Sequence, residues 1–98
     1  MKTIAEDEAR TRLQRLPGWA LKGDAIQRQF TCAGFPEAVA FLVRLAFDAE
    51  AADHHPDVQL SYKRLTLTYS THSAGGLTDK DFEGAARASD IARASGAS

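Results

Sequence analysis

Two pairs of short alternating segments, each pair joined by a tight link, constrain the fold of this chain more than any other feature. Residues 19–22 and 25–32 flank the dipeptide Gly23 and Asp24, which is typical of a two-residue hairpin connection. Residues 58–62 and 64–70 alternate between apolar and polar side chains and lie too close in sequence for anything but a second hairpin. The pattern therefore predicts four strands arranged as two antiparallel hairpins.

Helical segments precede and separate these hairpins. A first helix is predicted over residues 4–15, with Thr3 as its cap and Glu6 at the capping-box position. The main helix begins near Pro36, since proline is favourable at a first helical position, and runs to about Asp53. Up to this point the order is helix, two strands, helix, two strands.

A final helix is predicted after the glycine pair at positions 75 and 76. Thr78 is its expected cap, with Asp81 three residues later near the positive end of the helix. Its apolar positions are mainly alanines that bury little, and residues 94–98 are expected to fray. The order α-β-β-α-β-β-α predicts an α+β fold with a four-stranded antiparallel sheet and helices packed on one face. We expect residues 1–98 to form a single domain.

The main helix carries a carboxylate on the face that we predict to be buried. At about 100° per residue, Glu50 falls within the apolar arc, whereas Asp48 points to solvent. The arc consists of Val39, Leu42, Val43, Ala46 and Phe47. A buried carboxylate without a partner would be costly, and His54, one turn later on the same face, is the predicted partner.

Composition and charge are those of an ordinary soluble globular protein. The chain has 98 residues, 44% hydrophobic and 26% charged, with 12 basic against 13 acidic side chains. This balance gives no general attraction to nucleic acid or to an anionic membrane. A single cysteine, Cys32, rules out an intramolecular disulfide and is expected to be a small buried thiol, and Trp19 is expected in the core. No segment approaches the roughly 20 apolar residues of a membrane span, and the acidic start is unlike a signal peptide, so we expect a cytoplasmic protein.

All three histidines belong to a small set of polar residues, two of them at the end of the main helix. The segment Asp53, His54, His55 and Pro56 fits a simple helix stop, because histidine interacts well with the helix dipole and proline follows. A zinc site is a second interpretation, but adjacent helical histidines point about 100° apart and rarely bind one ion. Hydrolysis by a serine nucleophile lacks the expected glycine pattern. General acid–base catalysis by imidazoles, which titrate near neutrality, is the remaining interpretation.

The spacing of these residues resembles the signature of pterin-4a-carbinolamine dehydratases. The signature positions are Glu50, His54, His55, Pro56, Tyr62, His72 and Asp81. The resemblance extends from about position 16 to position 90, through the segments at residues 16–19, 23–26, 70–72 and 76–81.

The resemblance implies a reaction and a set of site residues. The family dehydrates 4a-hydroxytetrahydropterin, the product of aromatic amino acid hydroxylases, to quinonoid dihydropterin, with no metal and no organic cofactor. It implies that His54, His55 and His72 are acid–base residues and that Glu50 orients them. The substrate is expected to contact Asp53, Pro56, Thr71, Ser73, Ala74 and Asp81.

The chemistry suits these residue types. One group must protonate the hydroxyl leaving C4a, and another must accept the proton of N5. We expect His54 and His72 to be the principal pair, with His55 mainly binding, and leave open which is acid and which is base. We expect residues 71–73 to continue the last strand outward and to offer unpaired backbone groups to the pterin. Asp81 is either a helix cap or a substrate contact.

The uncovered face or edge of so small a sheet predicts self-association, as a dimer or a tetramer. In the family, the last helix carries larger apolar residues that help to form the oligomer, so its alanines here favour a dimer or looser assembly. Animal relatives also serve as dimerisation cofactors of a homeodomain transcription factor. A non-catalytic relative that binds or assembles other proteins is therefore the alternative function.

Overall fold

The computed structural model describes residues 2–98, which form three α-helices, one 3₁₀ turn and a four-stranded antiparallel sheet. The strands lie in the order β1-β2-β4-β3, so the two hairpins pair through β2 and β4 at the centre of the sheet. The predicted α+β fold and its element order are confirmed. In chain order the elements are α1 (Glu6–Leu13), β1 (Ala20–Lys22), β2 (Ala25–Thr31), α2 (Phe35–Ala52), β3 (Asp57–Ser61), β4 (Arg64–Tyr69), η1 (His72–Ala74) and α3 (Asp79–Ala94).

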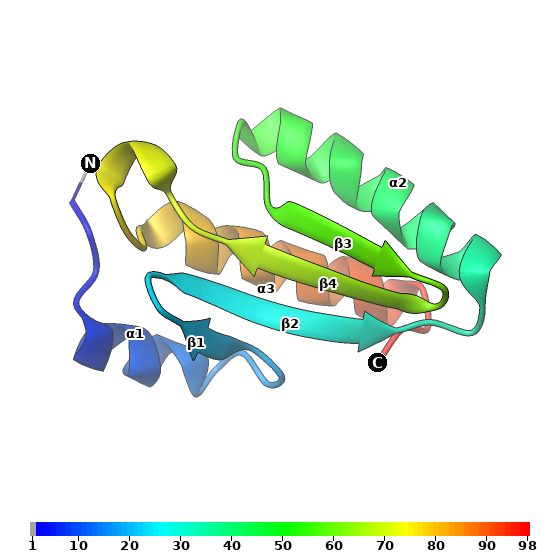
Figure 1. Cartoon of the computed structure of the whole chain (residues 1–98), viewed down its shortest axis with the longest axis horizontal. Coiled ribbons are helices and arrows are strands. Elements are labelled where there is room, and N and C mark those ends of the chain that lie inside the picture. The colour runs from blue at the N-terminus through cyan, green and yellow to red at the C-terminus, as the bar shows by residue number, and fades with distance from the viewer. Residues whose placement is uncertain (1) are drawn as a thin grey trace.

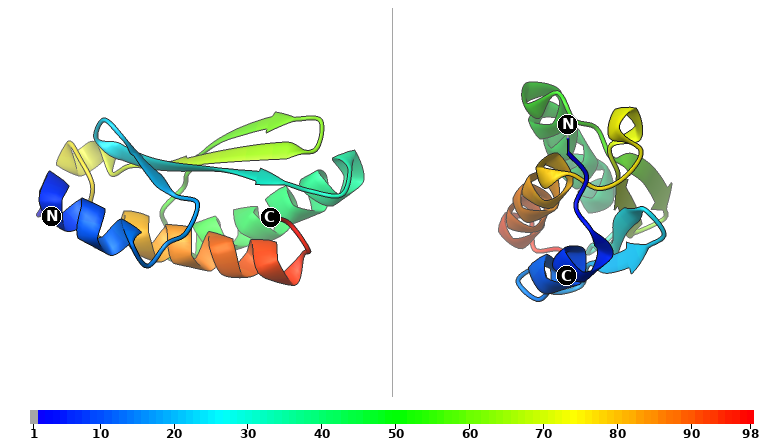
Figure 2. Two further views of the ribbon diagram at one scale, coloured as in Figure 1. Left: turned by 90° about the horizontal axis from the view of Figure 1, so that it is seen from below. Right: turned by 90° about the vertical axis from the view of Figure 1, so that its left-hand side faces the viewer.

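The helices cover one face of the sheet, as predicted. Figure 2 shows the strands as one layer and the helices as a second layer beneath it, while Figure 1 shows α2 alongside the β3 edge and α1 near the β1 edge. The open face is polar, and Gln27 Nε2 donates to Thr68 Oγ1 there at 2.9 Å. Polar side chains on the open face of the sheet therefore form hydrogen bonds with one another.

The alternation of β4 sorts its side chains as the sequence predicts. Leu65, Leu67 and Tyr69 are 0–1% exposed and form the centre of the core, whereas Thr66 and Thr68 lie on the other face. Period-two alternation is what a strand needs when only one of its faces is covered.

The face that α2 turns to the core is not the predicted one. Ala38, Phe41, Leu45 and Ala49 are the buried residues of this helix. The predicted arc is largely solvent-exposed instead, with Val39 36%, Val43 49% and Phe47 76% exposed. Since α2 carries two apolar stripes, periodicity alone could not decide which stripe meets the sheet.

Asp48, predicted to face solvent, is instead half-buried between two helices. Both of its carboxylate oxygens accept from Nε of Arg87 at 3.0 Å, and its side chain is 22% exposed. This ion pair links α2 to α3 directly.

Three alanines of α3 lie in the core, contrary to the expectation that they bury little, whereas Ala86 is exposed. Ala85 and Ala88 are 0% exposed and Ala92 is 2% exposed. Small side chains let the helix approach the sheet closely. At Gly84 there is no room for a side chain, because a Cβ there would lie 2.7 Å from Cε1 of Tyr69. The alanine content therefore reflects close packing inside one chain.

The segment after α3 does not fray as expected. The backbone N–H of Ser98 donates to the carbonyl of Thr31 at 3.0 Å, and the N–H of Thr31 donates back to Ser98 at 2.9 Å. The N–H of Ala97 also donates to the carbonyl of Ala92 at 2.9 Å. These bonds hold residues 95–98 against the end of β2.

The predicted capping of α1 by Thr3 is wrong. The N-cap position is taken by Ala5, in an extended conformation, and the helix begins at Glu6. The helix begins later than predicted because the N–H of Ile4 donates to the carbonyl of Leu77 at 2.8 Å, which keeps the residues before Glu6 extended. Glu6 therefore stands in the first turn, where its charge suits the helix dipole.

Trp19 and Cys32 are buried, as predicted, at 6% and 7% exposure. The indole N–H of Trp19 donates to Ser89 Oγ at 2.9 Å. Burial, with a further contribution from Glu37, raises the pKa of the Cys32 thiol. Among residues 2–98, no helix is both long enough and apolar enough to span a bilayer.

Replacing Gly84 with alanine is expected to lower the free energy of unfolding by about 1–3 kcal/mol, because the new methyl group overlaps the Tyr69 ring. In an unobstructed helix the same change stabilises by about 1 kcal/mol. Urea denaturation measures the effect. A second change, Tyr69→Leu, should remove the penalty of the added methyl group, and a single variant as stable as the parent would contradict the packing argument.

Candidate functional site

The turn that ends α2 sends two consecutive histidines in different directions. Asp53 caps the helix in the left-handed conformation, at φ 53°, and the N–H of His54 donates to the carbonyl of Ala49 at 3.1 Å. Left-handed caps are common at helix ends, and Asp tolerates this conformation better than most residues other than glycine. The following ring, that of His54, turns inward and that of His55 turns outward.

His54 pairs with Asp81, not with Glu50. Its Nε2 lies 2.6 Å from Oδ1 of Asp81, and the two side chains are 11% and 0% exposed. An ionised carboxylate only accepts hydrogen bonds, so it places the proton of a neutral ring on Nε2. Nδ1 is then the ring nitrogen with no hydrogen-bond partner among residues 2–98.

The second oxygen of Asp81 joins this pair to the segment that follows β4. Oδ2 accepts from Thr71 Oγ1 at 2.8 Å and from the N–H of Thr78 at 2.9 Å. The two threonine hydroxyls also lie 2.8 Å apart. Asp81 therefore caps α3, as one of its two predicted roles requires, and its fully buried carboxylate reaches the site only through His54.

Glu50 does not occupy the buried position that we predicted. Its Oε1 lies 2.8 Å from Nε2 of His55, and the side chains of Glu50 and His55 are 80% and 57% exposed. The carboxylate is on the solvent-facing side of α2, as is Phe47, and its partner is the outward-pointing His55. The error follows directly from assigning the wrong stripe of α2 to the core.

His72 lies in the 3₁₀ turn η1 and not on an extension of β4 as predicted. The turn forms because the carbonyl of Thr71 accepts from the N–H groups of Ala74 and Gly75, at 3.0 and 3.1 Å. Thr71 also pairs with Gly76 as an isolated bridge, so its backbone groups are not free for a ligand. His72 and Ser73 are exposed on this turn, next to the residue that contacts Asp81.

Two parts of the predicted site are therefore distinguished. One contains His54, Asp81 and Thr71, with His72 adjacent in the chain. The other is a hollow of about 200 Å³ beside α2, whose lining includes Glu50, His55 and Pro56 but, of the described residues, neither His54 nor His72. Across residues 2–98, His, Cys, Asp and Glu side chains form no group of three or more suited to hold a metal ion.

Tyr69 is a site residue that the sequence analysis did not identify. Its ring stacks on that of His54, with centroids 6.0 Å apart and planes 19° apart. Burial and then the charge of Asp48 raise the pKa of the Tyr69 hydroxyl, which has no hydrogen-bond partner among the described residues. The alternation of β4 predicted that Tyr69 faces the core, and this position places its ring against the inward-facing ring of His54.

Comparisons with known proteins agree on one family. The family model described as pterin 4 alpha carbinolamine dehydratase matches residues 2–91. A protein of Roseiflexus castenholzii is 49% identical over 90% of this chain and 95% of its own length, and one of Chloroflexus aurantiacus is 46% identical over 93% and 98%. Both carry the name "Putative pterin-4-alpha-carbinolamine dehydratase".

A solved structure has the same fold. It is described as a transcriptional coactivator/pterin dehydratase from Brucella melitensis and superposes with a TM-score of 0.88 at 35% identity. The match covers 93% of this chain and 99% of that one.

Asp81→Asn is expected to lower the free energy of unfolding by about 2 kcal/mol or more, because a neutral amide cannot accept all three buried hydrogen bonds. The matched control is Asp79→Asn in the same turn of α3, where an exposed pair with Arg12 is lost. That control should change stability by no more than about 1 kcal/mol. Equal losses in the two variants, measured by urea denaturation, would show that the buried carboxylate has no special role.

Proposed function

Because the chain belongs to the pterin-4a-carbinolamine dehydratase family, we propose that it converts 4a-hydroxytetrahydropterin to quinonoid dihydropterin by general acid–base catalysis. The reaction would recycle the pterin used by aromatic amino acid hydroxylases. The observation that carries the proposal is the buried Asp81 carboxylate, which contacts His54 at 2.6 Å and Thr71, the neighbour of His72, at 2.8 Å.

His54 is the proposed base. With the proton of the neutral ring held on Nε2 by Asp81, Nδ1 presents a lone pair that can accept the proton of N5. Stacking on Tyr69 restricts the orientation of the ring, so this lone pair points in a defined direction. A fixed, largely buried acceptor suits proton removal from a planar substrate.

His72 is the proposed acid. Its position on an exposed 3₁₀ turn gives it access to solvent protons, and in the protonated state it can donate to the hydroxyl leaving C4a. As the C4a–O bond breaks, its electrons go to oxygen, and the electrons of the N5–H bond form the C4a–N5 double bond. The products are one water molecule and quinonoid dihydropterin. The imidazoles of His54 and His72 then exchange protons with solvent and return to their starting protonation states.

His55 and Glu50 are proposed to bind substrate and not to transfer protons. The pair is exposed and borders the hollow beside α2, together with Pro56. Asp53, Ser73 and Ala74 lie on the two segments that flank the histidines, and we propose them as further contacts. In this arrangement Asp81 is a positioning residue that acts through His54.

His54→Ala and His72→Ala are each expected to lower kcat/KM for carbinolamine dehydration by about 100-fold or more, since a positioned acid or base contributes roughly 10²–10⁴-fold. His55→Ala should mainly raise KM. The measurement is stopped-flow absorbance of chemically generated 4a-hydroxytetrahydropterin, with circular dichroism as the test of folding. Undiminished turnover by the folded double variant of His54 and His72 would refute the mechanism.

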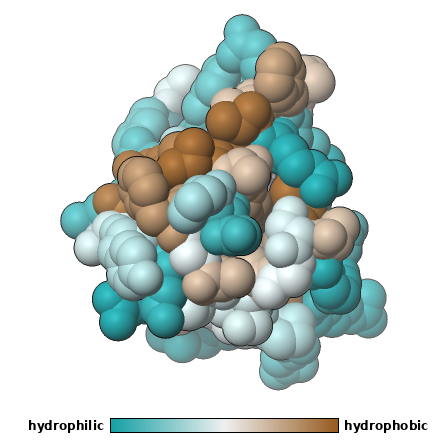
Figure 3. Space-filling view, turned by 90° about the vertical axis from the view of Figure 1, so that its right-hand side faces the viewer, coloured by the Kyte–Doolittle hydropathy of each residue, from teal (hydrophilic) through white to brown (hydrophobic). Residues whose placement is uncertain are grey.

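We further propose that the chain forms a homo-oligomer through the outer stripe of α2, defined here as Phe35, Val39, Val43 and Phe47. These side chains are 36–76% exposed, and Val58 on the edge strand β3 is 41% exposed. Figure 3 shows apolar surface gathered at the end of the molecule where α2 begins. Apolar surface of this kind is typical of an interaction site. Ala85, Ala88 and Ala92 of α3 are buried inside the chain, so they no longer argue against a tetramer.

Phe47→Glu combined with Val43→Glu should convert the oligomer to a monomer in sedimentation velocity, because two charges would then be buried at the interface. Arg44→Glu is the matched control and should leave the sedimentation coefficient unchanged, because Arg44 lies outside the stripe, on the flank of α2 where its Nη1 is 3.5 Å from Ser95 Oγ. A parent chain that is monomeric but captures a different protein through the same stripe would favour the alternative function, a protein-binding relative. The Brucella melitensis protein is described as a transcriptional coactivator as well as a pterin dehydratase, which is a role of that kind.

A further inference from the structure

A second polar hollow lies apart from the histidines, between the end of α1, β2 and the last turns of α3. Its volume is about 260 Å³, and three arginines contribute to its lining: Arg15, Arg28 and Arg93. Ser89 and Asp90 are the other polar residues that line it. Three guanidinium groups therefore lie around one small hollow, in a chain whose net charge is −1.

Arg28 is held in place by contacts that leave part of its guanidinium open. Its Nη1 donates to the carbonyl of Pro17 at 2.9 Å, and its Cζ lies 4.2 Å from the centroid of the Phe30 ring. Gly18 makes room for it, because a Cβ at that position would lie 2.6 Å from Nε of Arg28. The group is thus pre-organised, which lowers the entropic cost of binding an anion.

The positive charge in this hollow is only partly balanced. Asp90 pairs with Arg93, while Arg15 and Arg28 form no salt bridge within residues 2–98. Burial and then repulsion by the positive charge of Arg93 lower the pKa of Arg28. An anion in the hollow would relieve this repulsion.

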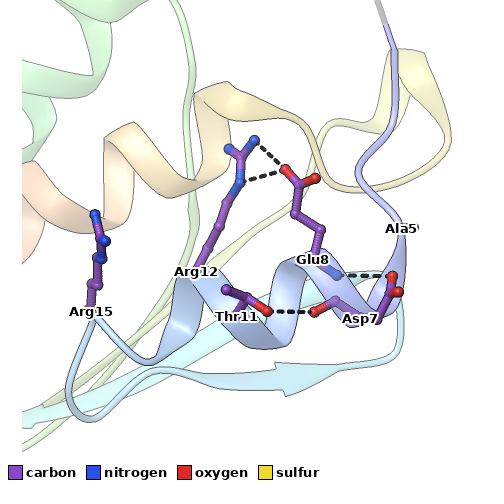
Figure 4. Close-up of a pocket in the computed structure, with 6 residues that line it drawn as sticks. All are labelled: Ala5, Asp7, Glu8, Thr11, Arg12 and Arg15. Carbon is purple, nitrogen blue, oxygen red and sulfur yellow. Dashed lines mark hydrogen bonds and ion pairs between the residues drawn. The ribbon is translucent and has the colours of Figure 1, made fainter.

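The larger hollow along α1 provides a contrast. It has a volume of about 660 Å³ and is lined by two arginines, Arg12 and Arg15. The guanidinium of Arg12 already contacts Glu8 at 2.6 Å and Asp79 at 2.7 Å. Figure 4 shows Arg15 standing apart from the Arg12–Glu8 pair, with no bond to any of the other residues drawn. Arg15 lines both hollows, and only the hollow beside α3 adds the guanidinium of Arg28, which has no salt bridge within residues 2–98.

We propose that the hollow between Arg15, Arg28 and Arg93 binds the phosphate group of a small soluble molecule, or inorganic phosphate itself. Arginine suits this ligand because its planar fork donates two parallel hydrogen bonds to phosphate oxygens. Ser89 Oγ supplies a further polar contact at the base of the hollow. Asp90 opposes binding, since its carboxylate occupies Arg93 and repels an anion.

The chain contains its own reporter for this site. Trp19 is the only tryptophan, and its indole N–H donates to Ser89 Oγ, a residue that lines the hollow, at 2.9 Å. An anion that draws the serine hydroxyl toward itself changes the environment of the indole. Intrinsic fluorescence of the full chain can therefore follow binding directly.

The experiment titrates the full chain with inorganic phosphate, against sodium chloride at matched ionic strength. Phosphate should change Trp19 fluorescence in a saturable manner, whereas chloride should not. Arg15→Gln combined with Arg93→Gln should weaken phosphate binding by about tenfold or more, since each lost charge-assisted hydrogen bond is worth about a tenfold change. Asp90→Asn should tighten binding. Arg64→Gln, which removes an exposed arginine of β4 outside the hollow, is the matched control.

Several outcomes would overturn the proposal. They are equal responses to phosphate and chloride, unchanged phosphate affinity in the double arginine variant, or equal weakening in the Arg64 control. Vesicles of phosphatidylcholine with and without phosphatidic acid form a separate arm. Binding to the acidic vesicles without binding to free phosphate would show a membrane contact and exclude the proposed small soluble ligand.

Discussion

The buried carboxylate of Asp81 is the interaction on which the rest of the structure depends. One carboxylate oxygen contacts the imidazole of His54. The other accepts from the hydroxyl of Thr71, after β4, and from the backbone N–H of Thr78, at the start of α3. A buried charge is tolerable only when it is fully hydrogen-bonded, and here the bonds come from three separate segments. The end of α2, the turn after β4 and the start of α3 are thereby fixed relative to one another.

The packing around this carboxylate extends the constraint into the core. Tyr69 lies against His54, Trp19 lies 5.8 Å from Tyr69 between ring centroids, and Gly84 lets α3 approach the same ring. A polar site on one side and an aromatic cluster on the other share Tyr69 as their boundary. The position of His54 is consequently set by the hydrophobic core as well as by its charged partner.

The sequence was informative wherever a local rule had only one solution. The alternation of β4 and the Gly23–Asp24 turn determined the hairpins, and Thr78 with Asp81 determined the start of α3, because each depends on neighbours in the chain. The pairing of His54 was not predictable in this way. Glu50 and Asp81 both carry a carboxylate that could pair with His54. Only the tertiary fold decides which of the two is buried beside the imidazole ring.

The two apolar stripes of α2 explain the remaining errors. In a helix with one apolar face, the sequence indicates which face is buried, whereas α2 has two apolar stripes. The buried stripe consists of Ala38, Phe41, Leu45 and Ala49. The 3₁₀ turn at His72 was hidden for a related reason. Its hydrogen bonds to the carbonyl of Thr71 are local. They replace strand pairing because β2 and β3, which are antiparallel to β4, begin opposite the end of β4 and offer no partner beyond it.

The left-handed residue Asp53 has a consequence for the two histidines that follow it. Neighbouring positions in the chain receive opposite surroundings: His54 is largely buried against Asp81, whereas His55 is exposed beside the exposed Glu50. Two chemically identical side chains thereby acquire different properties without any difference in residue type. A backbone torsion, and not the choice of amino acid, separates their environments.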